Sequence, residues 1–406
     1  MSIRTYLSAA KKQLRAAIQN QTHTSLVIGN ESADLDSITA ALLYGYINSS
    51  SLHRQGSNSY LIPITNIPAA DLSLRPELKA ILKHAYIDPS ELITLDDLHQ
   101  AELLPANTTW TLVDHNVLQG PLGLRYATRI TACIDHHADE NSIPPSASPR
   151  IITPAGSCTS LVANHVRETW ESLNASSTAI WAAHGQNDRL VDDVAYTSTW
   201  DGQAAMLALG SVLIDTAGLK DEGKVTDHDR RAVRYLEAKV FSSRKLSAGY
   251  DRDAFFKEIR EAKGDLEGLG LRDVLRKDYK VWSEGELSVG VASVVKSLEW
   301  LAGKSESFAE VLEEFRKERE LTLFAVMTTF TNEAGDFARE LLILPSGEES
   351  ASAAVKAFEF QSSEELQLVE KKMDGLSAPS RCFDQRNVSA SRKQVGPMLR
   401  EALKQA

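Results

Sequence analysis

Two adjacent imidazoles follow a carboxylate in the segment Asp135-His136-His137, directly after the apolar run Ile130 to Ile134. A short apolar run that ends in such side chains is typical of a buried parallel strand whose carboxyl end lies at a polar site. The same pattern occurs upstream, where Trp110 to Val113 is followed by Asp114-His115-Asn116. The sequence therefore predicts carboxylates and imidazoles at the ends of neighbouring strands.

Three further acids belong to the same predicted pattern. Ser25 to Gly29 is a predicted strand, and the loop after it carries Asp34 and Asp36 before a predicted helix over 38–47. Asp215 follows a predicted buried helix over 201–214. Because ligands bind where the carboxyl ends of parallel strands meet, we expect these acids to gather at one sheet edge.

This set of side chains suits divalent cations. Asp34 and Asp36 are separated by one residue and could reach different ions. Asp114 could bridge the two ions, His136 adds one nitrogen, and Asp215 closes the second site. Carboxylate-rich sites favour Mg²⁺ or Mn²⁺, and two such ions activate water and hold phosphoryl oxygens. Each acid alone is better explained as a cap or turn residue than as a ligand, and the histidine pair alone could be hydrogen-bonded core groups. Their recurrence at strand ends favours the metal site.

The elements around these residues predict two domains. Helical patterns at 77–84 and 95–103 lie between the first strands and favour an α/β, doubly wound parallel sheet. In the second half, helical runs separate three predicted strands, at 286–295, 321–330 and 339–344. This favours a smaller α+β domain with a mixed sheet. We predict domains at 1–220 and 250–406, joined by a linker and hinge at 221–249. The polar segments 184–188 and 227–229 are predicted to be loops.

Composition limits the function classes. The chain has 55 acidic and 44 basic residues, a formal net charge of −11, which argues against a general nucleic-acid binder. Its three cysteines lack CxxC spacing, and no apolar run is long enough for a bilayer. We expect a cytoplasmic monomer without nucleic-acid or membrane partners. The basic stretch 1–20 also resembles a mitochondrial presequence, but its apolar spacing favours a core-packed helix.

A second basic feature lies near the C-terminus. Ser391 and Gln394 have the spacing of a helix capping box, which places Arg392 and Lys393 at a helix start whose N–H groups favour anions. The simpler alternative is a solvated basic helix end. Beside a metal site that acts on phosphates, the cluster is better explained as a clamp for the substrate chain.

These motifs together resemble those of the DHH phosphoesterase superfamily. The matching segments are Asp34-Leu35-Asp36, Asp114-His115-Asn116, Asp135-His136-His137 and Asp215-Thr216. The C-terminal half resembles the associated DHHA2 domain, through Leu275 to Lys280 and Ser391 to Gln394. Within the superfamily, Gly29 to Ser37 resembles the fungal cytosolic exopolyphosphatases and animal prune proteins, whereas family II pyrophosphatases carry a histidine where Asn30 stands.

The resemblance implies roles for the individual residues. Asp34 and Asp114 would hold one ion, and the other would be held by Asp36, Asp114, His136 and Asp215. Asp135 would orient an imidazole as a supporting residue.

It also implies the residues that meet the substrate. His137 would face the phosphate and stabilise its charge or protonate the leaving oxygen. Lys280, Arg392 and Lys393 would bind the phosphate chain. The amide oxygen of Asn30 would be a weaker metal ligand than a histidine nitrogen, so the first ion would be bound less tightly. This change would favour Mg²⁺ over Mn²⁺, with Co²⁺ as an alternative.

We therefore expect an exopolyphosphatase that uses two divalent ions to cleave the terminal phosphate from inorganic polyphosphate, with the second domain closing over the first. Two alternatives remain within the superfamily: an inorganic pyrophosphatase, or a prune-like enzyme for short polyphosphates or nucleotide phosphodiesters. An alternative of another class is a regulatory protein that binds polyphosphate without catalysis.

Overall fold

The computed structural model describes the backbone at 1–99, 103–183, 189–373, 375–376 and 378–405, and the side chains of these residues except 99, 174–183 and 189–195. The chain forms two compact units, Met1–Ala262 and Lys263–Ala406.

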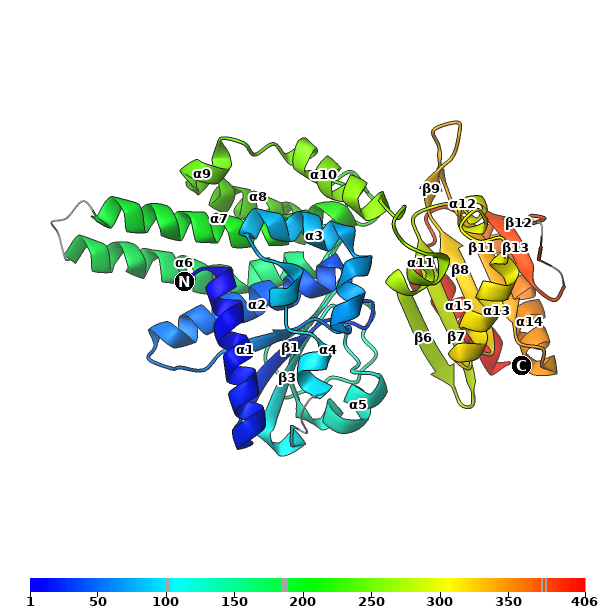
Figure 1. Cartoon of the computed structure of the whole chain (residues 1–406), viewed down its shortest axis with the longest axis horizontal. Coiled ribbons are helices and arrows are strands. Elements are labelled where there is room, and N and C mark those ends of the chain that lie inside the picture. The colour runs from blue at the N-terminus through cyan, green and yellow to red at the C-terminus, as the bar shows by residue number, and fades with distance from the viewer. Residues whose placement is uncertain (100–102, 184–188, 374, 377, 406) are drawn as a thin grey trace. The chain divides into compact units, whose positions relative to one another are not determined.

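The first unit is built on a parallel sheet (Figure 1). Its strands are β1 (Thr24–Ile28), β2 (Leu61–Ile64), β3 (Thr108–Val113), β4 (Ile130–Asp135) and β5 (Arg150–Ile152). The order is β2-β1-β3-β4-β5, and every pairing is parallel. This confirms the predicted doubly wound α/β class, although β2 and β5 were not predicted. The strand order reverses between β1 and β3, which is where ligands bind in such sheets.

Helices surround this sheet and supply much of the core of the first unit. They are α1 (Ile3–Asn20), α2 (Leu35–Arg54), α3 (Pro76–Leu82), α4 (Leu95–His99), α5 (Gly120–Tyr126), α6 (Cys158–Ala183), α7 (Arg189–Asp215), α8 (Asp227–Ser242), α9 (Arg244–Ser247) and α10 (Arg252–Gly264). The helix expected at 1–20 is α1, and its apolar face, including Ile3, Tyr6 and Leu14, is buried. In the described residues no helix has the length and apolar character that a bilayer crossing requires.

The division of the chain differs from the prediction. The segment 221–249, expected as a linker, contains α8 and α9, and α8 packs against α6 and α7. Apolar residues of α8, among them Val233 and Leu236, are fully buried in the core of the first unit. The division instead falls at 262/263, in the last turn of α10. Segment 227–229 begins α8 rather than forming a loop, while 184–188 lies outside the described residues.

The second unit contains the predicted mixed sheet. Its strands are β6 (Tyr279–Glu284), β7 (Leu287–Val294), β8 (Leu323–Thr328), β11 (Glu340–Pro345), β12 (Leu368–Glu370) and β13 (Arg381–Gln385), with a short hairpin of β9 (Phe330–Thr331) and β10 (Phe337–Ala338). The order is β12-β13-β11-β8-β7-β6, in which β7 and β8 are parallel and the other neighbours antiparallel.

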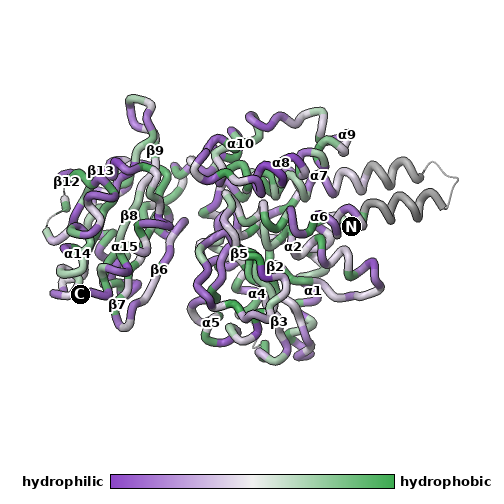
Figure 2. The backbone as a smooth tube through the Cα atoms, turned by 180° about the vertical axis from the view of Figure 1, so that it is seen from behind, coloured by the Kyte–Doolittle hydropathy of each residue, from purple (hydrophilic) through white to green (hydrophobic). Residues whose placement is uncertain are grey.

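Helices cover both faces of this second sheet. They are α11 (Leu271–Lys277), α12 (Leu298–Ala302), α13 (Phe308–Glu318), α14 (Glu349–Leu366) and α15 (Arg392–Lys404). Buried residues of α14 and α15 share one apolar cluster, and those of α11, α12 and α13 share another. The central strand β8 is buried along its whole length and is hydrophobic in Figure 2. Two-sided burial of this kind accounts for the continuous apolar run in its sequence.

Candidate metal centre

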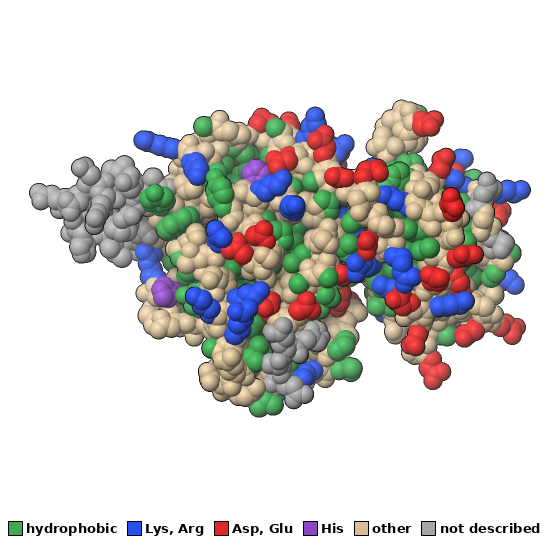
Figure 3. Space-filling model, in the orientation of Figure 1, with side chains coloured by type: hydrophobic (Ala, Val, Ile, Leu, Met, Phe, Trp, Pro, Cys, Tyr) green, Lys and Arg blue, Asp and Glu red, His purple; other side chains and the backbone are tan. Residues whose placement is uncertain are grey.

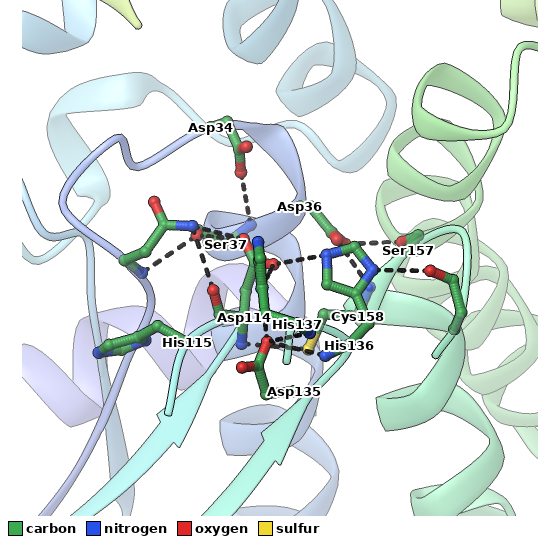
Figure 4. A network of polar contacts seen from close by, with 12 residues as sticks. Asp34, Asp36, Ser37, Asp114, His115, Asp135, His136, His137, Ser157 and Cys158 are labelled. Carbon is green, nitrogen blue, oxygen red and sulfur yellow. Dashed lines mark hydrogen bonds and ion pairs between the residues drawn. The ribbon is translucent and has the colours of Figure 1, made fainter. Parts of the chain in front are cut away.

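The ends of strands β1, β3 and β4 bring five of the predicted residues together, namely Asn30, Asp114, Asp135, His136 and His137 (Figure 4). Asp114 directly follows β3 and is 2% exposed, with a backbone φ of 61°. Its Oδ2 accepts hydrogen bonds from Asn30 Nδ2 at 2.8 Å and Ser37 Oγ at 2.7 Å. Its Oδ1 lies 3.1 Å from Nε2 of His136 and 3.8 Å from Nδ1 of His137. Ligand atoms of this carboxylate and the two imidazoles all lie within 4.8 Å of one another, close enough to hold a metal ion.

The tautomer of His136 can be assigned from its neighbours. Nδ1 lies 3.0 Å from the main-chain oxygen of Ala155, which only accepts hydrogen bonds, so Nδ1 carries the proton. In the neutral ring, Nε2 then presents its lone pair to Oδ1 of Asp114. Two acceptors that face each other in a buried site require a positive charge between them or a proton on the ring. The donor set therefore fits a divalent cation.

Asp135 holds the histidine pair in place. Its side chain is fully buried, and its Oδ1 accepts from the main-chain N–H groups of His136 at 2.7 Å and His137 at 3.2 Å. The same oxygen lies 2.7 Å from Nδ1 of His137. Burial alone would raise the pKa of Asp135, but the hydrogen bond and charge of His137 outweigh burial and lower it. Asn116 supports the carboxylate from the other side, donating to Oδ2 at 2.6 Å.

The amide of Asn30 has a definite orientation. Nδ2 donates to Asp114, while Oδ1 accepts from the main-chain N–H of Ser32 at 2.9 Å. Rotating the amide by 180° would place oxygen against a carboxylate and NH₂ against an N–H, so the observed orientation is favoured. Asn30 therefore acts on Asp114 as a donor here, rather than presenting the amide oxygen that the sequence resemblance implied as a metal ligand.

Asp36 is tied to the start of α6. Its Oδ1 accepts from Ser157 Oγ at 2.7 Å, Thr159 N at 2.9 Å and Ser211 Oγ at 3.1 Å, and its Oδ2 accepts from Cys158 N at 2.7 Å. Because a carboxylate has about four lone-pair positions, Oδ2 keeps acceptor capacity for one further partner. The buried anion also neutralises the positive end of α6.

Asp34 and Asp215 lie outside the group formed by Asp114, His136 and His137. Asp34 is the N-cap of α2, and its Oδ1 accepts from Ser37 N at 3.0 Å. Asp215 ends α7, and the next residue, Thr216, packs so closely on Gly156 that a Cβ there would lie 2.6 Å from it. Asp215 thus belongs to the chain segment that packs beside the start of α6.

Several supporting residues were not predicted. Ser37 and Asn116 contact the two central carboxylates, and Asp229 accepts from the main-chain N–H groups of Gly156 at 2.9 Å and Ser157 at 3.2 Å. Asp229 also completes a capping box with Thr226. The spacing Thr226-x-x-Asp229 is a helix-start signal that could have identified the beginning of α8.

The predicted basic cluster lies in the second unit. Ser391 and Gln394 form the expected capping box at the start of α15. Arg392 donates to Asp278 twice, from Nη2 to Oδ1 at 2.7 Å and from Nη1 to the main-chain oxygen at 3.0 Å. Lys280 is on the adjoining strand β6, and Lys393 is exposed. The α15 start therefore presents an arginine whose guanidinium is held in a fixed orientation.

The interactions of Asp36 lead to a stability prediction. We expect Asp36→Asn to lower the unfolding free energy by about 2 kcal/mol or more, because its NH₂ group cannot accept from a buried N–H or hydroxyl. Urea unfolding of the full chain measures this, with Asp251→Asn as a control that alters an exposed carboxylate bonded to Ala254 N. Equal losses in the two variants would show that the buried network adds nothing beyond ordinary capping.

Both units of the chain match families of known proteins. Residues 24–184 match the DHH family N-terminal domain, and residues 257–402 match the DHHA2 domain. A Schizosaccharomyces pombe protein provisionally named an exopolyphosphatase is 32% identical over 100% of this chain and 99% of its own length. The rat exopolyphosphatase PRUNE1 is 28% identical over 96% of this chain and 77% of its own.

Pyrophosphatases are more distant relatives. A manganese-dependent inorganic pyrophosphatase of Methanothrix thermoacetophila is 24% identical over 93% of this chain and 98% of its own. Among solved structures, a Methanococcus jannaschii protein provisionally titled a family II inorganic pyrophosphatase matches with a TM-score of 0.55 and 18% identity, covering 94% of this chain and 100% of that one. This last similarity establishes a shared fold.

Proposed function

The chain belongs to the DHH family and carries a DHHA2 domain, and from this premise we propose that it is a metal-dependent exopolyphosphatase. The observation that carries the proposal is the buried contact between Asp114 and His136, where a carboxylate and an imidazole nitrogen face each other at 3.1 Å in an arrangement that suits a bound cation. The family II pyrophosphatase fold and the named relatives support a phosphoanhydride substrate.

We propose that two divalent ions, Mg²⁺ or Mn²⁺ with Co²⁺ as an alternative, are held by the carboxylates and one imidazole. The proposed ligands are Asp34, Asp36, Asp114, His136 and Asp215. When bound, such ions supply positive charge to phosphoryl oxygens and acidify a water nucleophile. Hydrogen bonds from Asn30 and Ser37 fix Oδ2 of Asp114, and its Oδ1 faces the two histidines.

His137 is the proposed catalytic imidazole. Its Nδ1 is bonded to Asp135, and its side chain is 25% exposed, compared with 5% for His136. A carboxylate behind the ring favours the imidazolium, which can stabilise the phosphate charge and donate a proton to the leaving oxygen. Asp135 is the proposed positioning residue, because it fixes both the ring and the main chain of the histidine pair.

We propose that the phosphate chain of the substrate is bound by Lys280, Arg392 and Lys393. Arg392 is prepared for this role because Asp278 already orders its guanidinium, which reduces the entropy lost on binding. The helix start at α15 adds main-chain N–H groups, which favour anions. We propose that the enzyme works as a monomer in the cytoplasm, consistent with the cysteine usage and the acidic composition.

Phosphate release from polyphosphates of defined length tests the proposal. Protein stripped with EDTA should release no phosphate above background, and Mg²⁺, Mn²⁺ or Co²⁺ should restore release, because the clustered donors need a cation. We expect tripolyphosphate and longer chains to be cleaved faster than pyrophosphate or cyclic nucleotide. A reversed preference would identify a pyrophosphatase or phosphodiesterase, and tight polyphosphate binding without release under every ion would identify a regulatory binder.

A further inference from the structure

A second basic site lies in the first unit, along helices α6 and α8. A hollow of about 400 Å³ is lined by Arg167 of α6 and by Arg231, Arg234, Tyr235 and Ala238 of α8. This volume is at the lower end of the range for small-molecule sites. Three of the five lining residues are arginines and none is acidic, in a chain whose formal net charge is −11. The lining therefore differs in sign from the molecule as a whole.

Many arginines in other parts of the chain have carboxylate partners, whereas some, such as Arg75 and Arg129, donate to main-chain oxygens. Arg150 pairs with Asp139 at 2.6 Å, and Arg400 pairs with Glu284 at 2.7 Å. Acidic and basic side chains are similarly interspersed on the face drawn in Figure 3. Within the part of the chain that the structure describes, no ion pair is found for Arg167, Arg231 or Arg234, and these three arginines line the same hollow.

The acids nearest these arginines on the helices also bind other cations. Glu171, four residues after Arg167, pairs with the buried Lys239 at 2.8 Å, and its charge also acts on Arg167, so Arg167 is partly neutralised. Glu237, three residues after Arg234, binds Arg252 and Tyr250 instead. Arg234 therefore lacks the ion pair that this helical spacing would allow with Glu237.

Arg231 bonds to a main-chain oxygen rather than to a carboxylate. Its Nε donates to the main-chain oxygen of Asp227, four residues earlier, at 3.2 Å. Like charges at Arg231 and Arg234, on one face of α8, repel each other. Both side chains are exposed to solvent, which screens this repulsion, and an anion bound beside them would reduce it further.

The hollow is also ordered. The guanidinium carbon of Arg167 lies 4.9 Å from the ring centroid of Tyr235, which is 7% exposed. Lys239 lies 5.3 Å from the same centroid, so cations already contact this ring and leave little of it for a stacked base. Planar guanidinium groups that line one hollow match the oxygens of phosphates.

The site is separate from the metal centre. Asp229, near the start of α8, contacts the residues before α6, so both helices begin near that centre. Arg167 lies nine residues into α6, roughly 14 Å from Cys158 at 1.5 Å per residue.

We propose that Arg167, Arg231 and Arg234 form a binding site for a multiply charged phosphate anion. Two sources share this chemistry, a distant part of a bound polyphosphate chain and a free phosphate anion. Only the first rests on the proposed function.

Direct binding tests the site without requiring catalysis. Tripolyphosphate is titrated calorimetrically into the full chain in EDTA at low salt. We expect the double variant R231Q/R234Q to bind at the second basic site at least tenfold more weakly than the parent protein, because two charged donors are lost. The matched control R230Q/R244Q removes the same charge from exposed arginines of α8 and α9 outside the hollow, and should bind within twofold of the parent. The Arg392 cluster is intact in all three proteins and contributes equally.

Two further measurements separate the sources. If the site holds part of the substrate, R231Q/R234Q raises KM for long polyphosphate but leaves KM for tripolyphosphate unchanged. If it holds a free anion, both KM values stay constant and the variant loses affinity for orthophosphate. Equal tripolyphosphate and orthophosphate affinities in the parent and R231Q/R234Q would overturn the proposal. Absence of phosphate release by the parent would overturn the proposed function and leave the binding result valid.

Discussion

Replacement of Asp114 by Asn should reduce phosphate release by about a thousandfold or more, since charge stabilisation worth several kcal/mol is lost with the carboxylate. Asp114 is the point where the strand ends converge. Its Oδ2 is fixed by Asn30 and Ser37, and its Oδ1 faces both histidines. An amide at this position keeps the shape of the side chain but loses the negative charge that a cation between Asp114 and His136 would need.

Asparagine is the informative substitution here because of the backbone. Asp114 has a φ of 61°, in the left-handed region that asparagine and aspartate tolerate better than other non-glycine residues. Alanine would add conformational strain to the loss of charge, so a loss of activity in Asp114→Ala would have two explanations. Asp114→Asn removes the charge without adding this strain, so it tests the loss of charge alone.

The measurement is kcat for phosphate release from tripolyphosphate under saturating Mg²⁺, together with thermal unfolding of the same samples. Asp139→Asn is the control, because Asp139 follows the same histidine pair but is paired with Arg150 near the surface. We expect the control to stay within twofold of the parent. Retention of more than a tenth of parental activity by Asp114→Asn would exclude a central role for this carboxylate.

The strand ends could be predicted because their signal is local. At β3 and β4 an apolar run changes within one residue to carboxylates and imidazoles, and this change marks where a buried strand leaves the sheet. The short strands β2 and β5 lack that signal. Leu61–Ile64 contains a proline, and Arg150–Ile152 lies between Pro149 and Pro154, so each segment has the composition of a loop.

The contacts that were missed are long-range. The acceptor for the N–H groups of Cys158 and Thr159 at the start of α6 is Asp36, more than 120 residues earlier. No spacing rule connects residues so far apart, because their proximity depends on how α2 and α6 pack. The orientation of Asn30 was missed for the same reason, since its amide is directed by a carboxylate on another strand.

In the second unit, replacement of Arg392 by Ala should raise KM for polyphosphate by about tenfold to a hundredfold with little change in kcat. Loss of one charge-assisted hydrogen-bonding group costs about 1.5–3 kcal/mol of binding, and about 1.4 kcal/mol corresponds to a factor of ten. Although burial would raise the pKa of Asp278, the charge of Arg392 lowers it, so the pair remains ionic and the guanidinium ordered.

The alternative is that Arg392 merely fastens α15 to the segment around β6, and the chain contains a matched control for that role. Arg400, two turns further along α15, donates to Glu284 at the end of β6 at 2.7 Å. Arg400→Ala therefore removes a comparable ion pair between the same two elements but leaves the helix start untouched. Initial rates over a range of polyphosphate concentrations give KM and kcat for both variants. If substrate binding is the role of Arg392, KM rises only in Arg392→Ala. If both variants show the same increase, the basic start of α15 is structural and the phosphate chain must be bound by other residues.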